Sequence, residues 1–236
     1  MTAQATAFLR LPFEYQLAAL QADYARVLHA NWLPHYNQQA HQGDWNCLPL
    51  RAASGRSDNI YADNGEAYAD TEWLSLCPYF AEILHQLACE KIAVRLMSLA
   101  AGARILAHRD PGGGFEDGVA RLHIPIITDP RIHFVIDGET VHFSAGHCWY
   151  MNANCLHAVT NPSPINRIHL VIDCIPNPWL REVFLNAGWR ENAPAYYGDT
   201  SVNDDNVAQI IDALLSRGDA TSTQLARELQ ARKNAR

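Results

Sequence analysis

The chain has 236 residues with a formal net charge of −7, and 48% of its residues are hydrophobic. This length allows one main domain with a substantial core. Because the balance is acidic and the Lys and Arg residues are scattered along the chain, a general phosphate-binding surface is excluded, and we expect no nucleic-acid partner.

The chain carries no run of eighteen consecutive apolar residues, and its first ten residues lack a basic start followed by a long apolar stretch. We therefore expect a cytoplasmic protein without a membrane partner. The six cysteines are far apart and form no CxxC pair, in a chain large enough to fold without disulfides. Free thiols in a reducing compartment fit this pattern.

The N-terminal part is predicted to begin with a helix. Between residues 12 and 31 apolar side chains recur at helical spacing, so one face should pack against a larger core. Residues 32–77 are irregular and rich in Asn, Asp, Gly and Trp, which indicates loops with short strands. A second short helix is expected from Tyr79 to Cys89.

From about residue 92 to 175 the pattern changes to short β-rich runs separated by turn residues. The expected strands are Ala93–Leu99, Arg104–His108, Ala120–Thr128, Arg131–Ile136, Glu139–Ser144, Cys148–Asn152, His157–Asn161 and Arg167–Cys174. Strands of this length and spacing are typical of a barrel or jelly roll. Asp137-Gly138 predicts a two-residue type I′ hairpin turn, which places Phe134 opposite Val141.

The C-terminal part is predicted to be helical. A helix is expected from Trp179 to Ala187, followed by a polar linker at about 196–206 and a pair of helices. The first helix of the pair has an apolar stripe and ends at Gly218, and the second begins near Thr221, where a Gln three residues on gives capping-box spacing.

These elements predict a mainly β fold with flanking helices. We expect a β-rich domain with N-terminal helices over residues 1–198 and a helical pair over residues 199–236. The helical pair is expected to pack against the barrel, with a cover over the site or a homodimer contact as alternatives.

Seven of the eleven histidines lie between residues 108 and 169, so a metal site is to be sought there. In His108-Arg109-Asp110 the first and third side chains of an extended segment point to the same side and can share one ion, although an isolated HxD is commonplace. His157, at the start of a later strand, is the expected third ligand. Two histidines and one carboxylate leave three positions open, which suits Fe(II). His133 and His142 oppose each other across the hairpin and are interpreted as solvent-side imidazoles.

Two strands are expected to direct charged side chains into the barrel. Alternation places Arg167 and His169 on the face opposite Ile168, Leu170 and Ile172, and Arg121 and His123 follow the same arrangement. Buried arginines need an anionic partner. A dicarboxylate fits, with one carboxylate beside the iron and the other in a bidentate contact with Arg167. The alternative is an internal salt bridge, for example to Asp173 or Glu139.

Several motifs together resemble the aspartyl/asparaginyl β-hydroxylase family, in order and spacing, over about 80 residues. They are Leu99-Ala-Ala-Gly102, His108-Arg-Asp110, Arg121-Leu-His123-Ile-Pro125, Gly146-His-Cys-Trp149-Tyr-Met-Asn152, His157-Ala-Val-Thr-Asn161 and Arg167-Ile-His-Leu-Val-Ile-Asp173, with an upstream match in Gly43-Asp-Trp45 and Pro49-Leu-Arg51. The resemblance implies a double-stranded β-helix of the jelly-roll type.

The resemblance also implies an Fe(II)- and 2-oxoglutarate-dependent dioxygenase. It places iron on His108, Asp110 and His157, the distal carboxylate of 2-oxoglutarate on Arg167, and Arg121 and His123 near the other end of that molecule. With O2, such an enzyme hydroxylates a side-chain carbon and releases succinate and CO2. The expected substrate is a small amino acid, free or carrier-bound, or an Asp, Asn or Pro residue of a short peptide. The alternative is a non-catalytic cupin-like module that binds a metal or a small acid as a sensor.

Overall fold

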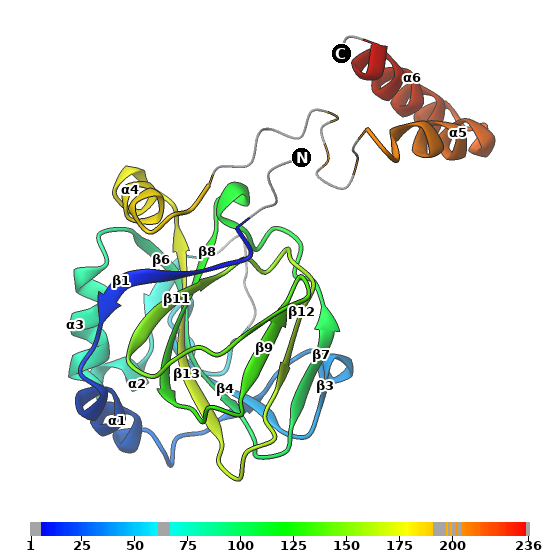
Figure 1. Ribbon diagram of the computed structural model, residues 1–236. Helices are drawn as coiled ribbons and strands as arrows, with labels where there is room; N and C mark the ends of the chain where they lie inside the picture. Colours follow the sequence, from blue (N-terminus) through cyan, green and yellow to red (C-terminus); the bar gives the residue numbers. More distant parts are fainter. Residues whose placement is uncertain are drawn as a thin grey trace. The chain divides into compact units, whose positions relative to one another are not determined.

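The computed structural model describes residues 6–60, 67–190, 197, 199, 202 and 204–234. The chain divides into a large unit, Thr6–Arg190, and a small unit whose described residues lie between residues 197 and 234 (Figure 1). The domain boundary expected after residue 198 falls on a residue outside those described.

The large unit contains two antiparallel β-sheets (Figure 1). The larger sheet has the order β1-β11-β8-β13-β6-β4-β2, and β5 pairs with β4. Its strands are β1 (Phe8–Glu14), β2 (Leu33–Pro34), β4 (Trp45–Ala53), β5 (Tyr68–Asp70), β6 (Glu90–Leu99), β8 (Ala120–Ile127), β11 (His147–Met151) and β13 (Arg167–Ile175).

The smaller sheet has the order β10-β9-β12-β7-β3. Its strands are β3 (His41–Gln42), β7 (Arg104–His108), β9 (His133–Ile136), β10 (Glu139–Val141) and β12 (His157–Thr160). From β6 to β13 the chain changes sheet at every step except within the β9–β10 hairpin. This alternation between two facing sheets defines a double-stranded β-helix, which confirms the expected jelly roll.

All eight strands expected between residues 92 and 175 are present, with ends shifted by a few residues. The hairpin turn is also confirmed. Asp137 and Gly138 have φ values of 47° and 84°, as a type I′ turn requires, and Val141 pairs with Phe134.

The two faces of the larger sheet have different environments. Ile168, Leu170 and Ile172 of β13 point outwards into a hydrophobic core with the helices. The helices of this unit are α1 (Leu17–Arg26), α2 (Glu72–Ser75), α3 (Pro78–Gln86) and α4 (Pro178–Asn186), with single 3-10 turns η1 (Gln38–Ala40) and η2 (Phe115–Asp117). The opposite face of the sheet lines the space between the two sheets, where a second apolar cluster lies. Arg167 and His169 therefore point between the sheets, as predicted.

The N-terminal expectation was partly wrong, because residues 8–14 form the edge strand β1 and the helix begins only at Leu17. Leu11 is buried, and β1 pairs with β11. The apolar residues before Leu17 fit a period of two as well as a helical period, and the open edge of β11 selects the strand. In α1, Asp23 is buried and accepts hydrogen bonds from the backbone N–H groups of Tyr79 and Phe80, at 2.7 and 2.9 Å. It thus caps the neighbouring helix α3.

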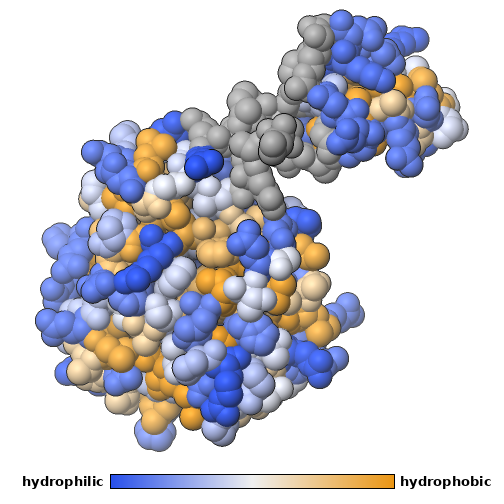
Figure 2. Space-filling view, viewed as in Figure 1, coloured by the Kyte–Doolittle hydropathy of each residue, from blue (hydrophilic) through white to orange (hydrophobic). Residues whose placement is uncertain are grey.

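The small unit contains the predicted helical pair, α5 (Val207–Arg217) and α6 (Ala220–Asn234). Hydrophobic side chains gather between the two helices, and their outer faces are largely hydrophilic (Figure 2). Gly218 ends α5 with a φ of 70°. The cap predicted at Thr221 is wrong, because the carboxylate of Asp219 accepts the hydrogen bond from the Ser222 N–H at 2.8 Å.

All six cysteines are buried and free. In the described part of the chain, no helix is long and apolar enough to cross a lipid bilayer.

Candidate metal centre

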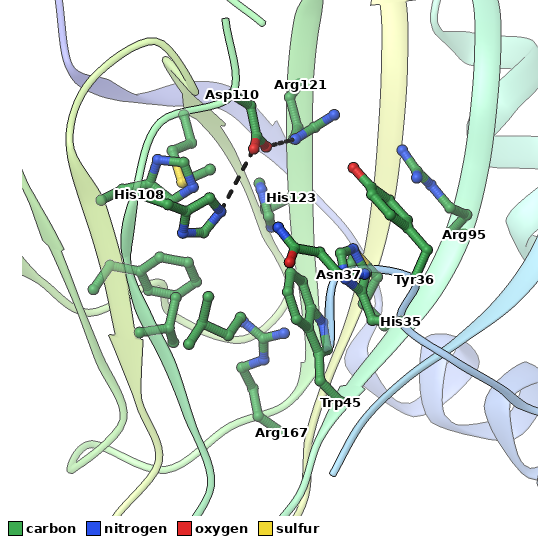
Figure 3. A pocket seen from close by; sticks show the side chains of 16 residues that line it. His35, Tyr36, Asn37, Trp45, Arg95, His108, Asp110, Arg121, His123 and Arg167 are labelled. Atoms are coloured by element: carbon green, nitrogen blue, oxygen red, sulfur yellow. Dashed lines mark hydrogen bonds and ion pairs between the residues drawn. The ribbon is translucent and has the colours of Figure 1, made fainter. Parts of the chain in front are cut away.

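Three of the predicted site residues meet between the sheets. His108 ends β7 and His157 begins β12, and the two residues are direct partners in this antiparallel strand pair. Their ring centroids lie 4.3 Å apart. Asp110 follows two residues after His108, and one ligand atom from each of the three residues lies within 4.8 Å of the other two. Figure 3 shows His108 and Asp110 directed towards each other at one end of a cavity.

Backbone carbonyl groups fix the orientation of both imidazoles. Nδ1 of His108 lies 2.8 Å from the carbonyl oxygen of Leu106, and Nδ1 of His157 lies 2.9 Å from that of Cys155. An Nδ1–H donor at each ring leaves Nε2 with a free lone pair. Nε2 of His108 lies 3.5 Å from Oδ1 of Asp110. Burial lowers the pKa of His157, so its ring is held neutral, as a metal ligand must be.

The loop that carries Asp110 is attached to the segment before β12. The Asp110 N–H donates to the carbonyl of Ala153 at 2.8 Å, and Gly112 N–H donates to the side chain of Asn154 at 2.9 Å. A Cβ atom on Gly113 would lie 2.8 Å from the Cβ of Ala153, so only glycine allows this approach. Asp110 is therefore placed by the loop and not by strand geometry.

Arg121 is in contact with two carboxylates. Its Nη1 donates to Asp110 Oδ2 at 2.8 Å and its Nε to Asp173 Oδ1 at 2.8 Å. Asp173 also accepts a hydrogen bond from Arg95 at 2.5 Å. The charge of Asp173 raises the pKa of Arg121, which stays a cation. The internal salt bridge that the sequence offered as an alternative is thus present at Arg121. The contact of Arg121 with a cosubstrate stays a prediction.

Arg167 is different, because it forms no ion pair with any carboxylate in the described part of the chain. Arg167 is 2% exposed, and its Nε atom is buried without a hydrogen-bond partner. The guanidinium carbon lies 5.7 Å from the ring centroid of Phe134. Burial lowers the pKa of Arg167 to about 10, so the group is still charged at neutral pH. A buried cation without an anionic partner indicates a binding site for an acidic ligand.

His123 and His169 form a neutral pair next to Arg167. Their Nδ1 atoms lie 3.4 Å apart, and burial, followed by the charge of Arg167, lowers both pKa values well below the ordinary range. The Nε2 atoms of both rings are buried without a partner. His123 lines the cavity, whereas His169 is not part of the cavity lining. A role for His123 in cosubstrate binding stays a prediction.

Sequence reasoning missed part of the cavity wall. His35, Trp45 and Arg95 line the cavity, and the His35 and Trp45 rings are stacked with centroids 3.5 Å apart (Figure 3). Burial, and then the charge of Arg95, lowers the pKa of His35 to about 3. Arg95 could have been found, since it shares the inward face of β6 with Met97. His35 lies in an irregular segment whose pattern gives no such signal.

These residues lie within residues 14–176, which match the model of the aspartyl/asparaginyl beta-hydroxylase family. The chain belongs to this family. Two curated relatives are similar over part of their length. L-proline cis-3-hydroxylase 1 from a Streptomyces species is 27% identical over 136 residues, which are 56% of this chain and 47% of the relative. L-proline cis-4-hydroxylase from Rhizobium meliloti is 26% identical over 149 residues, 60% of this chain and 52% of the relative.

The chain spans about half the length of the curated relatives it matches. Among solved structures, an oxidoreductase of the 2OG-Fe(II) oxygenase family from Burkholderia pseudomallei has a TM-score of 0.50 and 14% identity, covering 72% of this chain and 85% of its own. This likeness shows a shared fold and no more. Helices α5 and α6 lie outside the range matched by the family.

Proposed function

We propose that the protein is an Fe(II)- and 2-oxoglutarate-dependent dioxygenase that hydroxylates a side-chain carbon of an amino acid. The observation that carries this proposal is one cavity that contains both a His-Asp-His cluster and a buried, unpaired guanidinium. The cluster could hold a metal, and the guanidinium needs an acid. Folding alone does not explain the guanidinium, because it is a buried charge without a carboxylate partner.

The donor set fits ferrous iron. Nε2 of His108, Nε2 of His157 and Oδ1 of Asp110 would be the ligands, with two neutral nitrogens and one carboxylate oxygen. Three protein ligands on one side of an octahedral ion leave positions for a cosubstrate and for O2. The backbone carbonyls bonded to the two imidazoles would keep the rings oriented when metal binds.

The unpaired guanidinium fits the distal carboxylate of 2-oxoglutarate. Arg167 would bind this carboxylate through two parallel hydrogen bonds, and the apolar surroundings would strengthen them because water is excluded. Arg121 and His123 would contact the end of 2-oxoglutarate nearer the iron. When bound, iron and 2-oxoglutarate supply the activation of O2 that leads to a hydroxylated product, succinate and CO2.

The remaining cavity wall would select the substrate. Arg95 carries a positive charge that suits an amino-acid carboxylate, and the stacked rings of His35 and Trp45 offer an apolar surface for a small side chain. Two relatives that hydroxylate L-proline support a small-molecule substrate of this kind. We propose that the substrate is an amino acid, free or carrier-bound, or an Asp, Asn or Pro residue in a short peptide. The α5–α6 pair would offer a surface for a homodimer contact.

The proposal is tested by anaerobic reconstitution with Fe(II) and 2-oxoglutarate. A weak visible charge-transfer band is expected when both are present, and it should be absent with Asp110→Ala. His133→Ala is the matched control, because this histidine lies in the smaller sheet outside the cluster and should leave the band unchanged.

The reconstituted enzyme is then exposed to air with single amino acids and short peptides. Mass spectrometry should show the gain of one oxygen in one substrate, together with the formation of succinate. A band with no succinate under any condition would instead support a cupin-like binding module. The absence of any band in the wild-type protein would refute the proposed metal and cosubstrate site.

A further inference from the structure

Four buried or half-buried charges of alternating sign form a continuous chain from the metal cluster across the larger sheet. Asp110 accepts from Arg121, Arg121 donates also to Asp173, and Asp173 accepts from Arg95. The Asp173 and Arg95 side chains are 8% and 10% exposed, so most of this chain is shielded from water. Arg95, at the far end of this series of ion pairs, is therefore linked to the His-Asp-His cluster through direct contacts.

Strand register explains the order of these charges. Arg121 and Asp173 are direct partners in the β8–β13 pair. Arg95 is the partner of Val171 in the β6–β13 pair, two residues before Asp173 on the same face. The central strand thus places its one carboxylate between the guanidiniums of both neighbouring strands. Without that carboxylate, two cations would face each other inside the protein.

Arg121 uses different edges for its two partners. Nε and Nη2 contact Asp173, at 2.8 and 3.3 Å, so one side of the planar guanidinium is occupied. Only Nη1 reaches Asp110, and it contacts Oδ2. Oδ1 of Asp110 is left facing Nε2 of His108. The carboxylate is thereby held through one oxygen and presents the other to the metal position.

We propose that Asp173 is a positioning residue for the metal ligand Asp110 and acts through Arg121. Asp173 holds the Nε edge of Arg121 and prevents the guanidinium from turning to bind both oxygens of Asp110. A guanidinium released from Asp173 would compete with the metal for Oδ1, because a bidentate Arg–carboxylate contact is a stable arrangement. This inference rests on the proposed metal centre.

The test is the affinity of the purified apoprotein for Mn(II), measured by titration calorimetry, which requires no turnover. Asp173→Asn should weaken binding about 10- to 100-fold, the usual effect of losing a group that orients a metal ligand. Asp23→Asn is the matched control, because Asp23 is equally buried and caps α3 away from the cavity. It should lower stability and leave the Mn(II) affinity unchanged.

A double-mutant cycle separates action through Arg121 from general loosening of the fold. If Asp173 acts through Arg121, the Asp173→Asn/Arg121→Ala double variant binds Mn(II) no more weakly than Arg121→Ala alone. If the losses of Mn(II) affinity in the two single variants multiply in the double variant, the inference is overturned. Should Asp173→Asn not fold, Asp173→Glu keeps the charge but displaces the carboxylate by one methylene, and wild-type affinity in that variant would equally overturn the inference.

The wild-type titration distinguishes the two levels of the argument. If the wild-type protein binds no Mn(II), the proposed metal centre fails and this inference fails with it. If the wild-type and Asp173→Asn proteins bind Mn(II) with equal affinity, the inference fails and the metal centre stands.

Discussion

Replacing Arg167 with methionine should stabilise the ligand-free protein and abolish the effect of 2-oxoglutarate. Arg167 is buried without a carboxylate partner, and burial lowers its pKa to about 10. Because the charged form is the disfavoured one, this unfavourable contribution is fully present at every pH well below 10 and is relieved only above it. The depression of the pKa corresponds to about 3 kcal/mol at neutral pH.

Methionine is uncharged and of similar length, so the variant should recover part of this free energy. We expect Arg167→Met to raise the unfolding free energy by about 1–3 kcal/mol, which is about 2–10 °C in Tm for a domain of this size. The assay is a thermal melt of both proteins with Mn(II), with and without 2-oxoglutarate. At about 100 times its Kd, 2-oxoglutarate should stabilise the wild-type protein by about 3 kcal/mol and the variant not at all.

Arg121→Met is the matched control, because Arg121 also lies in the cavity but is paired with Asp110 and Asp173. Removing this guanidinium leaves two carboxylates close together, and should destabilise the protein by about 3 kcal/mol. The reasoning about Arg167 would be refuted if Arg167→Met melted several degrees below the wild-type protein without 2-oxoglutarate. Such a result would mean that Arg167 is compensated within the folded chain.

Three further outcomes are expected. Asp110→Ala should weaken Mn(II) binding more than about 100-fold in calorimetric titration, since one of three ligands is lost; unchanged binding would remove Asp110 from the ligand set. Burial would raise the pKa of Asp173, but the charges of Arg121 and Arg95 lower it to about 2. The stabilising effect of its charge is thus complete above about pH 4 and is lost as the pH falls towards 2. Urea unfolding should therefore show a difference in unfolding free energy between the wild-type and Asp173→Asn proteins of about 2 kcal/mol that shrinks over this interval. A difference that stays constant with pH would contradict this. Asp219→Ala should destabilise α6 through loss of its N-cap, seen as lower helicity by circular dichroism, whereas Thr221→Ala should have almost no effect.

The sequence predicted the β-rich half of the large unit well because its signals are local. Alternation along each strand and the Asp137-Gly138 turn depend on neighbouring residues, and the structure confirms both. The region before residue 32 was less predictable. Its apolar spacing is compatible with a strand or a helix, and the choice depends on the edge of β11, which lies more than 130 residues further along the chain.

The meeting of His108, Asp110 and His157 was predicted from spacing and resemblance, and the structure brings these residues together. The partners of Arg121 could not be fixed in advance. Asp173 shares a strand with Arg167, but it lies directly opposite Arg121 on the neighbouring strand, and residues opposite each other on paired strands approach more closely. Which guanidinium stays unpaired therefore depends on the pairing of β8 with β13, which one strand alone does not reveal.

The two faces of strand β13 have different roles, and a shift of the strand by one residue would swap them. Its odd-numbered positions from Arg167 to Asp173 serve the interior chemistry, while Ile168, Leu170 and Ile172 anchor the helical layer. A deletion of one residue within this strand would turn the Arg167 guanidinium towards the hydrophobic core under the helices and place aliphatic side chains in the cavity. Substitutions inside β13 should therefore be tolerated better than insertions or deletions, which change the side of the sheet on which each following side chain lies.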